Sequence, residues 1–330
     1  MADMLSVNHS SNPDSFQGSA EDTLDLAIIG AGPAGLTAGM YGARSRYRTF
    51  IFEKMAAGGT ITITEWIENY PGFPEGISGY ELASKMEEQA LHFGARLVQE
   101  EVVKIERDGP YKIIYTDQRQ YRARALLLVT GTSLKKLGVS GEKEYTGRGV
   151  SYCATCDGAF YKDKVVVVVG GGDSAVEEGI YLTKFARKVI LIHRRDQLRA
   201  AKIVQERAFT NPRMEFIWDS VVEEIKGESK VTHVVLRNLK TEVRSVQNTD
   251  GVFVFVGQIP NNQLAQSLGL QRDDRGFVIT GSDMQTSEPG IWAAGDIRSK
   301  SLLQIATAVG EGAQAEFSAE KYLEAWQEGA

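Results

Sequence analysis

The residues in this chain best suited to chemistry are Cys153 and Cys156, the only two cysteines in its 330 residues. The Cys-x-x-Cys spacing is that of a dithiol that can close to a small disulfide ring and open again. The same spacing can form half of a zinc site, but structural zinc takes about four nitrogen or sulfur ligands. The chain has no second cysteine pair, and its four histidines show no ligand spacing. The pattern therefore favours redox chemistry over metal binding.

A glycine-rich stretch at residues 30–35 follows an apolar run and precedes an expected helix. In Gly-x-Gly-x-x-Gly, the first glycine permits a tight turn, the second lets a pyrophosphate approach the backbone, and the third lets helix and strand pack closely. The diphosphate would lie on the free amides of the helix N-terminus. Glu53 ends the next expected strand, where a carboxylate can bond both hydroxyls of an adenosine ribose. A glycine turn without a ligand is the alternative, and the complete strand, helix, strand and acid unit favours a nucleotide site.

A second glycine-rich stretch, residues 170–175, follows a run of five valines, which is typical of a parallel strand buried on both faces. At the position that corresponds to the acid of the first unit, this unit has His193, Arg194 and Arg195, with Arg199 beyond. A carboxylate there would repel a ribose 2′-phosphate, whereas arginines bind one through charge-assisted bonds. A solvated basic helix start is the alternative. The matched spacing favours NADPH here and a cofactor with free ribose hydroxyls in the first unit.

The rest of the chain supplies strands and helices that must position these loops. Thr130 and Gly131 end one expected strand and would place small residues beside a nucleotide. Asp296 ends another, ahead of a long expected helix at 302–326, where it can accept a hydrogen bond from a ribityl hydroxyl or cap the helix. Further strands are expected at 24–29, 49–52, 102–105, 111–115, 121–129, 165–169, 188–192, 215–218, 231–239, 252–256 and 276–279, helices at 36–46, 79–92 and 175–184, and surface loops at 58–60 and 69–74.

The composition is that of an α/β protein of about two domains. Hydrophobic residues make up 42%, glycines number 34 and the net charge is −6, which does not suit binding to nucleic acid. No apolar run approaches the ~20 residues that cross a membrane. Two cysteines in a long chain indicate a reducing compartment, so we expect a cytoplasmic location. Residues 1–23 are polar without the apolar segment of a signal peptide, and we expect a disordered leader.

From Leu24 to Leu323 the chain resembles the low-molecular-weight thioredoxin reductase family of flavoprotein disulfide reductases. The resemblance implies an α/β fold of two Rossmann-like nucleotide-binding domains of the three-layer ββα type. An NADPH-binding domain at 141–251 would be inserted in an FAD-binding domain made of 24–140 and 252–330. It also implies a two-stranded hinge and a homodimer. The matching motifs are 30–35, 65–72, 153–157, 170–178, 193–200, 251–257 and 290–296.

The resemblance also assigns cofactor contacts, position by position, and no metal. FAD is expected to contact Gly30, Gly32, Pro33, Ala34, Gly35, Glu53, Gly59, Thr60, Asn69, Val102, Thr130, Gly131, Gly295, Asp296, Gln304 and Ile305. NADPH is expected to contact Gly172, Asp173, Ser174, Glu177, His193, Arg194, Arg195 and Arg199.

The reaction that the resemblance implies passes a hydride from the nicotinamide to the flavin, which reduces the disulfide through Cys156. Cys153 then attacks the disulfide of thioredoxin, while Asp157 serves as proton donor and acceptor. Attack requires a thiolate. Because the dithiol would belong to the NADPH domain, it cannot face flavin and thioredoxin at once, and rotation of one domain against the other is implied.

Three motifs depart from the family pattern. Leu303-Gln304-Ile305 stands where Arg-Gln-Ala is usual, Thr60 where a glutamine is usual, and Gln258 where a histidine is usual. The first two remove a cation and an amide from the expected flavin neighbourhood. A disulfide reductase fed by another donor such as ferredoxin is therefore one alternative, and the intact arginines argue against it. A non-catalytic flavin-binding redox sensor is another, and Asp157 argues against that. Ferredoxin–NADP reductases built on this fold lack the cysteine pair.

Overall fold

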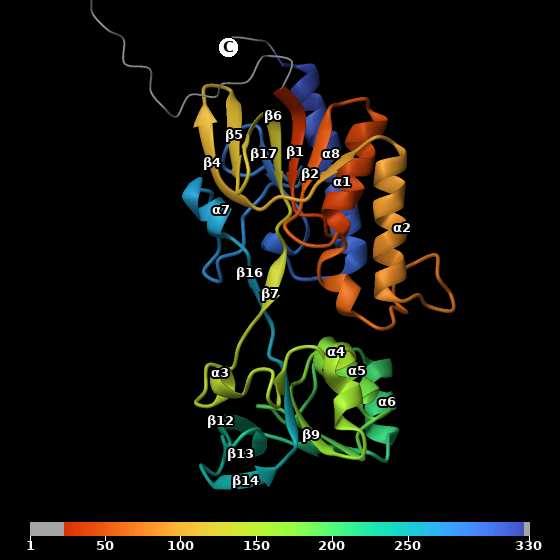
Figure 1. The fold of residues 1–330 in the computed structure, drawn as a ribbon, viewed down its shortest axis with the longest axis vertical. Coiled ribbons are helices and arrows are strands. Elements are labelled where there is room, and N and C mark those ends of the chain that lie inside the picture. The colour runs from red at the N-terminus through yellow and green to blue at the C-terminus, as the bar shows by residue number, and fades with distance from the viewer. Residues whose placement is uncertain (1–22, 327–330) are drawn as a thin grey trace, which may run out of the picture.

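The computed structural model describes residues 23–326, and its two larger sheets define two units (Figure 1). We call them the seven-stranded unit and the five-stranded unit after those sheets. The leader predicted at residues 1–23 lies outside the described residues, except for Thr23. Thr23 begins a strand, so it is not part of a leader. Over the described range, no helix combines the length and the apolar character needed to cross a membrane.

The seven-stranded unit is organised around β1 (Thr23–Ile29), which runs directly into the first glycine loop and α1 (Pro33–Arg44). β1 pairs in parallel with β2 (Thr49–Phe52) and β6 (Gln120–Leu128), so all three strands end at one edge of the sheet. Loops that follow parallel strands meet at this edge, which is where such sheets bind ligands. The other elements are β3 (Arg96–Val98), β4 (Val102–Asp108), β5 (Tyr111–Thr116), β17 (Ile291–Ala293), α2 (Gly79–His92), α7 (Gln263–Ser267), α8 (Ile305–Glu324), and the 3₁₀ turns η2 (Gly59–Ile63) and η4 (Gly295–Ile297).

Segments from opposite ends of the chain complete this unit. The strand order is β3-β2-β1-β6-β5-β4, and β17, which is close to the C-terminus, pairs in parallel with β6. α8 packs against α1 so closely that a Cβ at Gly312 would overlap the carbonyl oxygen of Ala34. The core on this face of the sheet combines side chains of β1, α1, α2 and α8. The C-terminal helix therefore supports the first glycine loop from below.

The five-stranded unit has three layers. Its central sheet is entirely parallel in the order β11-β10-β9-β15-β8, and the valines of β9 (Val165–Gly170) are the buried centre that the sequence predicts. α5 and α6 pack on the face that contains Val166 and Val168, and β12 and β13 pack on the face that contains Val167 and Val169. The other elements are α3 (Glu142–Tyr145), β8 (Val150–Ser151), α4 (Ala154–Asp157), η3 (Gly158–Tyr161), α5 (Asp173–Leu182), β10 (Lys188–Ile192), α6 (Lys202–Thr210), β11 (Met214–Ile217), β12 (Ser220–Gly227), β13 (Val231–Asn238), β14 (Arg244–Asn248) and β15 (Gly251–Phe255).

Two antiparallel segments, β7 (Thr132–Leu134) and β16 (Gln258–Pro260), connect the units (Figure 1). β15 belongs to the five-stranded sheet, between β9 and β8. The boundary predicted between residues 251 and 252 therefore falls inside β15, and the chain leaves this unit only after Phe255. The reason is that β15 supplies a central buried strand that this sheet needs.

Most expected elements are confirmed, and β2, α2 and β10 have the predicted bounds. The strand predicted at 276–279 is wrong, because Val278 forms only isolated bridges with Arg272 and Arg298. Residues 59–63, expected to begin in a surface loop, form the short helix η2. The α/β fold class with two nucleotide-binding-type units is confirmed.

Candidate functional site

A cavity of about 540 Å³ lies between the two units, and both glycine loops contribute to its wall. It gathers 14 of the 16 residues predicted to contact FAD, all except Gly35 and Val102. Gly35 lies beneath Gly30, and Val102 begins β4 at the edge of the core. From the other unit, Asp173, Ser174 and Glu177 of the predicted NADPH contacts line the same cavity. The structure thus brings part of the second predicted site next to the first. The other predicted NADPH contacts do not line this cavity: Gly172, His193, Arg194, Arg195 and Arg199.

The wall formed by the first glycine loop suits a diphosphate. Gly30 has φ +115°, and a Cβ there would lie 2.5 Å from the carbonyl oxygen of Val129. A Cβ at Gly32 would meet nothing within 4 Å, so ligand atoms can approach the backbone at this residue. Gly32 is also the N-cap of α1 and makes no side-chain capping bond, while Pro33 begins the helix. The first amides of α1 are therefore left for an anion.

Glu53 ends β2 in the position predicted for a ribose-binding acid. Its Oε2 accepts a hydrogen bond from the Ala31 amide at 3.0 Å, and its Oε1 accepts one from the Met55 amide at 3.1 Å. These two bonds fix the carboxylate against the glycine loop. A carboxylate has about four acceptor positions, so hydroxyl groups can still bind to it.

Asp296, on η4, faces the cavity from the C-terminal segment. Burial raises the pKa of Asp296, and the charge of Lys300 opposes that effect. Lys300 Nζ lies 3.2 Å from Asp296 Oδ1, yet this oxygen has no hydrogen bond of good geometry within residues 23–326. The N-cap of α8 is Gln304, so the alternative that Asp296 caps the long helix is wrong. A buried oxygen without a donor fits a ribityl hydroxyl, and the donor set as a whole fits FAD.

The second glycine loop is prepared in the same way. Gly172 is the N-cap of α5 without a side-chain capping bond, and a Cβ there would meet nothing within 4 Å. A Cβ at Gly171 would overlap the imidazole of His193, so His193 supports the loop from beneath. Burial, then the charges of Arg199 and Arg195, lower the pKa of His193. The loop can therefore receive a second diphosphate on its free amides.

The three predicted phosphate-binding arginines are exposed at the end of β10. The amide of Arg199 donates to the carbonyl of Gly171 at 2.7 Å, which holds this arginine next to the glycine loop. In the part of the chain that the structure describes, no carboxylate forms a salt bridge with Arg194, Arg195 or Arg199. Guanidinium groups that are exposed and unpaired fit a 2′-phosphate, and thus fit NADPH.

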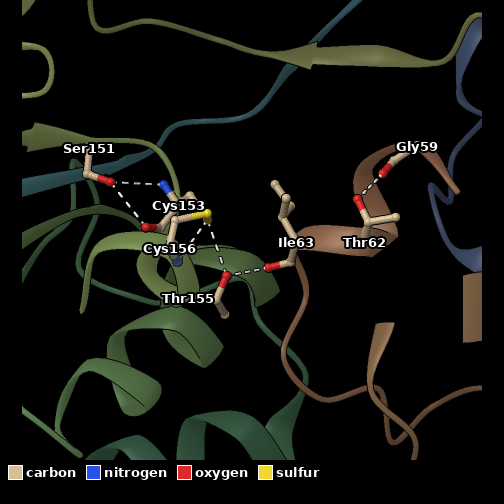
Figure 2. Close-up of a disulfide and its surroundings, with 7 residues drawn as sticks. All are labelled: Gly59, Thr62, Ile63, Ser151, Cys153, Thr155 and Cys156. Atoms are coloured by element: carbon tan, nitrogen blue, oxygen red, sulfur yellow. Dashed lines mark hydrogen bonds between the residues drawn. A yellow bond between two sulfur atoms is a disulfide. The ribbon is translucent and has the colours of Figure 1, made fainter. Parts of the chain in front are cut away.

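Cys153 and Cys156 form a disulfide at the start of α4, with their Cα atoms 5.4 Å apart (Figure 2). Cys153 Sγ accepts from the Cys156 amide at 3.1 Å and lies 3.2 Å from Thr155 Oγ1. Ser151 Oγ accepts from the Cys153 amide at 3.1 Å. The backbone amide directed at this sulfur favours its thiolate form, whereas the hydroxyl proton of Thr155 goes to the Ile63 carbonyl. The sulfur of Cys153 is therefore the better prepared of the two for nucleophilic attack.

The disulfide does not belong to the cavity in this arrangement. Neither cysteine lines the cavity, and neither does Asp157, which closes the same turn through its amide to the carbonyl of Cys153. Cys156 is exposed and Cys153 is half-buried. The second glycine loop and the disulfide are parts of one unit, and here the loop is the one that faces the cavity.

Trp66, Gln258 and Leu303 are among the cavity residues that were not predicted contacts. Gln258 and Leu303 lie beside matched motifs and depart from the family pattern, so the sequence gave a signal for them. Gln258 accepts a hydrogen bond from Thr132 across the paired connection, at 3.0 Å. Trp66 is 57% exposed and lies in the matched motif 65–72, but no contact was assigned to it.

Comparison with known proteins agrees with this geometry. The model of the family described as pyridine nucleotide-disulphide oxidoreductase matches residues 24–312. The thioredoxin reductase of Peptoclostridium acidaminophilum is 48% identical over 92% of this chain and 98% of its own. A crystal structure of Lactococcus lactis thioredoxin reductase, described as the FR conformation, is 46% identical over 92% of this chain and 100% of its own, with a TM-score of 0.90. The thioredoxin reductase structure from Streptococcus pyogenes is 49% identical over 93% of this chain and 100% of its own, with a TM-score of 0.62.

The two solved structures differ in how well they superpose on this chain, although they are about equally similar to it in sequence. Chains this similar share the folds of their individual domains. A low score over the whole length then reflects a different placement of one domain relative to the other. The arrangement of the two units described here is thus close to that of the Lactococcus lactis structure.

Proposed function

This chain belongs to the pyridine nucleotide-disulphide oxidoreductase family and, within it, to the low-molecular-weight thioredoxin reductases, and we propose that it carries electrons from NADPH through FAD and the Cys153–Cys156 pair to thioredoxin. It is a thioredoxin-disulfide reductase. The observation that supports this route best is the shared cavity. One wall is a glycine loop that suits FAD, the facing wall is a glycine loop that suits NADPH, and the second loop is in the same unit as the disulfide.

The seven-stranded unit would hold FAD. The amides of α1 would bind its diphosphate, Glu53 its adenosine ribose and Asp296 its ribityl chain. When bound, the flavin supplies the two-electron redox chemistry, and the protein supplies orientation and electrostatics. Gln304 would be fixed beside it, because its Oε1 accepts a hydrogen bond from Asn69 at 3.1 Å.

The five-stranded unit would present NADPH to that flavin. Gly172 leaves space for the diphosphate, and Arg194, Arg195 and Arg199 offer unpaired charges to the 2′-phosphate. We propose this unit as the NADPH-binding domain and the seven-stranded unit as the FAD-binding domain, joined by β7 and β16 as a hinge. We also propose that the protein is a homodimer, as its family resemblance implies. We propose a cytoplasmic location, since the low cysteine content suits a reducing compartment.

Transfer to thioredoxin would take place at the disulfide. Two electrons and two protons convert the Cys153–Cys156 disulfide to a dithiol. The Cys153 thiolate attacks one sulfur of the thioredoxin disulfide and releases the other as a thiolate, which takes a proton. The Cys156 thiolate then attacks Cys153 Sγ, re-forms the disulfide and releases the second thioredoxin thiolate. Asp157, the next residue of α4, would exchange the protons. Since neither cysteine lines the cavity, reduction of the disulfide requires a different placement of the two units.

The test is an anaerobic titration of the purified yellow protein. NADPH is expected to bleach the flavin, and oxidised thioredoxin is expected to restore the colour. Cys153→Ser should keep bleaching by NADPH and lose thioredoxin turnover. Failure of NADPH to bleach the flavin would refute the proposed donor.

A second donor is the one rival with a structural observation in its favour. Leu303 and Thr60, which replace a cation and an amide of the family pattern, both line the cavity. If reduced ferredoxin bleaches the flavin and NADPH does not, ferredoxin is the donor. The unpaired arginines favour NADPH.

A further inference from the structure

One short segment of the seven-stranded unit makes three side-chain contacts with the five-stranded unit. Glu65 forms an ion pair with Lys184 at 3.0 Å, and Glu68 forms one with Arg207 at 2.7 Å. Near the start of the segment, Thr155 Oγ1 donates to the carbonyl oxygen of Ile63 at 2.6 Å (Figure 2). All of these contacts lie away from the connecting strands β7 and β16. They can therefore resist rotation about those strands.

Acidic side chains outnumber the two cations in the cleft at this interface. A cleft of about 180 Å³ lies between the units, and its wall includes Lys184 and Arg207. Four carboxylates line the same cleft: Glu65, Glu68, Glu177 and Glu178. Burial, and then the charges of Glu177 and Glu65, raise the pKa of Glu178 to about 7. Removal of a cation would leave these acids facing one another across the interface.

The same segment also forms part of the wall of the cofactor cavity. Ile63, Thr64, Trp66 and Glu68 line that cavity, while Glu65 and Trp66 line the cleft. The placement of this segment therefore affects both the cavity and the contact between the units. Gly76 keeps Trp66 close to the loop, because a Cβ at this glycine would overlap the indole.

We propose that Glu65, Glu68, Lys184 and Arg207 form an ionic clasp that holds the units in the arrangement in which both glycine loops share the cavity. They are positioning residues and touch no reacting atom. Each ion pair is between 42% and 59% exposed on its side chains, so each is weak and is screened by salt. Weak contacts suffice, because the two arrangements of a moving protein differ little in free energy. Salt and charge at these four positions then shift the balance between the arrangements.

Any effect of the clasp on turnover rests on the proposed function, whereas its effect on the placement of the two units does not. The test therefore measures the distance between the units directly. Spin labels are attached to Tyr80→Cys on α2 and Val243→Cys beside β14, both strongly exposed, in a Cys153→Ser/Cys156→Ser background that keeps its bound cofactor. Pulsed dipolar spectroscopy then gives the distribution of distances in salt of about 0.1 M and about 1 M, where the screening length is about 10 Å and about 3 Å.

At low salt, the background protein is expected to show the distance of the clasped arrangement. At high salt, the fraction of molecules at this distance is expected to decrease. Lys184→Glu should lower the ratio of clasped to unclasped molecules about fivefold at low salt, which is equivalent to about 1 kcal/mol. The swap Glu65→Lys with Lys184→Glu should restore the ratio. Lys188→Glu is the matched control, because its ion pair with Glu215 at 2.6 Å lies within the five-stranded sheet, and it should change nothing.

Two results would overturn the clasp. One is a distance distribution that neither salt nor Lys184→Glu changes. The other is a charge swap whose ratio of clasped to unclasped molecules is as low as that of Lys184→Glu alone. Either result would leave the proposed electron route untouched. Conversely, if NADPH did not reduce the flavin, the distance measurement would still decide on the clasp.

Discussion

Glu316 on α8 is a carboxyl group in the core, and replacing it by glutamine should stabilise the protein increasingly as the pH rises from about 4.5 to about 7. The residue is 1% exposed, and its Oε1 has no hydrogen bond within the described residues. Burial, and then the charge of Glu320, raise the pKa of Glu316 from 4.5 to about 7. Glutamine has the shape of the protonated acid and cannot ionise. Glu316→Gln therefore removes the cost of ionisation and keeps the packing.

The size and the sign follow from proton linkage. In the unfolded chain the group ionises near its ordinary pKa, whereas in the folded protein it stays protonated up to about 7. Below both values the group is protonated in both states, and the substitution has no linkage effect. As the pH rises through this window, the wild type loses about 3 kcal/mol of unfolding free energy, and it loses no more above the window. Glu316→Gln should therefore be more stable by about 3 kcal/mol at about pH 8.

Thermal unfolding followed by circular dichroism at about pH 5 and about pH 8 measures this difference. We expect a rise in Tm of about 4 °C at the higher pH and a much smaller one at the lower pH. Glu324→Gln, at an exposed position of the same helix, is the control and should change the stability by less than about 0.5 kcal/mol at both. An equal rise at both pH values, or a lower Tm for Glu316→Gln at the higher one, would refute the reasoning.

Three further variants test the site and its support. Arg195→Ala combined with Arg199→Ala should raise the KM for NADPH at least tenfold, which corresponds to about 1.4 kcal/mol or more from lost charge-assisted bonds. The KM for NADH should stay nearly unchanged. A parallel rise for both nucleotides would contradict a 2′-phosphate site. Gly172→Ala should fold normally, since its Cβ meets no protein atom within 4 Å, yet should weaken NADPH binding measured by calorimetry; unchanged binding would mean that no diphosphate approaches this backbone. Gly312→Ala should lower the free energy of unfolding by about 1–3 kcal/mol and release FAD during gel filtration, because its Cβ overlaps Ala34 O under the first glycine loop. Gly310→Ala on the same helix is the control: its Cβ meets nothing within 4 Å, and it should be neutral or stabilising. Equal behaviour of the two variants would exclude close packing of α8 on α1 as the cause.

The glycine loops could be predicted from the sequence because each one depends on local constraints. Residues 30–35 combine a turn with positive φ at Gly30, a close backbone approach at Gly32 and tight packing at Gly35, and each requirement restricts the residue type. The valines of β9 are buried on both faces, which only a central parallel strand allows. The contrast between Glu53 and the three arginines could also be read from the spacing alone.

The features that were missed depend on contacts between distant parts of the chain. Phe277 and Val278 are buried, so their apolar run suggested a strand, but their neighbours offer only single bridges. Trp66 reaches the cavity because a loop without periodicity is held against Gly76 and faces the other unit. β15 was assigned to the wrong side of a boundary, because its place between β9 and β8 is set by the sheet and not by its own residues.

The location of the disulfide and the second glycine loop in one unit constrains how strong the clasp can be. In the present arrangement Asp173 and Ser174 line the cavity, and Cys156 is exposed outside it. On the proposed route, reduction of the flavin needs this arrangement, and reduction of the disulfide needs another, so every turnover includes a move in each direction. A buried, well-formed ion pair that stabilised one arrangement would raise the free-energy barrier to leaving it by as much as it stabilised it. Exposed pairs such as Glu65 with Lys184 add only about 0.2–1 kcal/mol each, which is enough to bias the placement and too little to trap it.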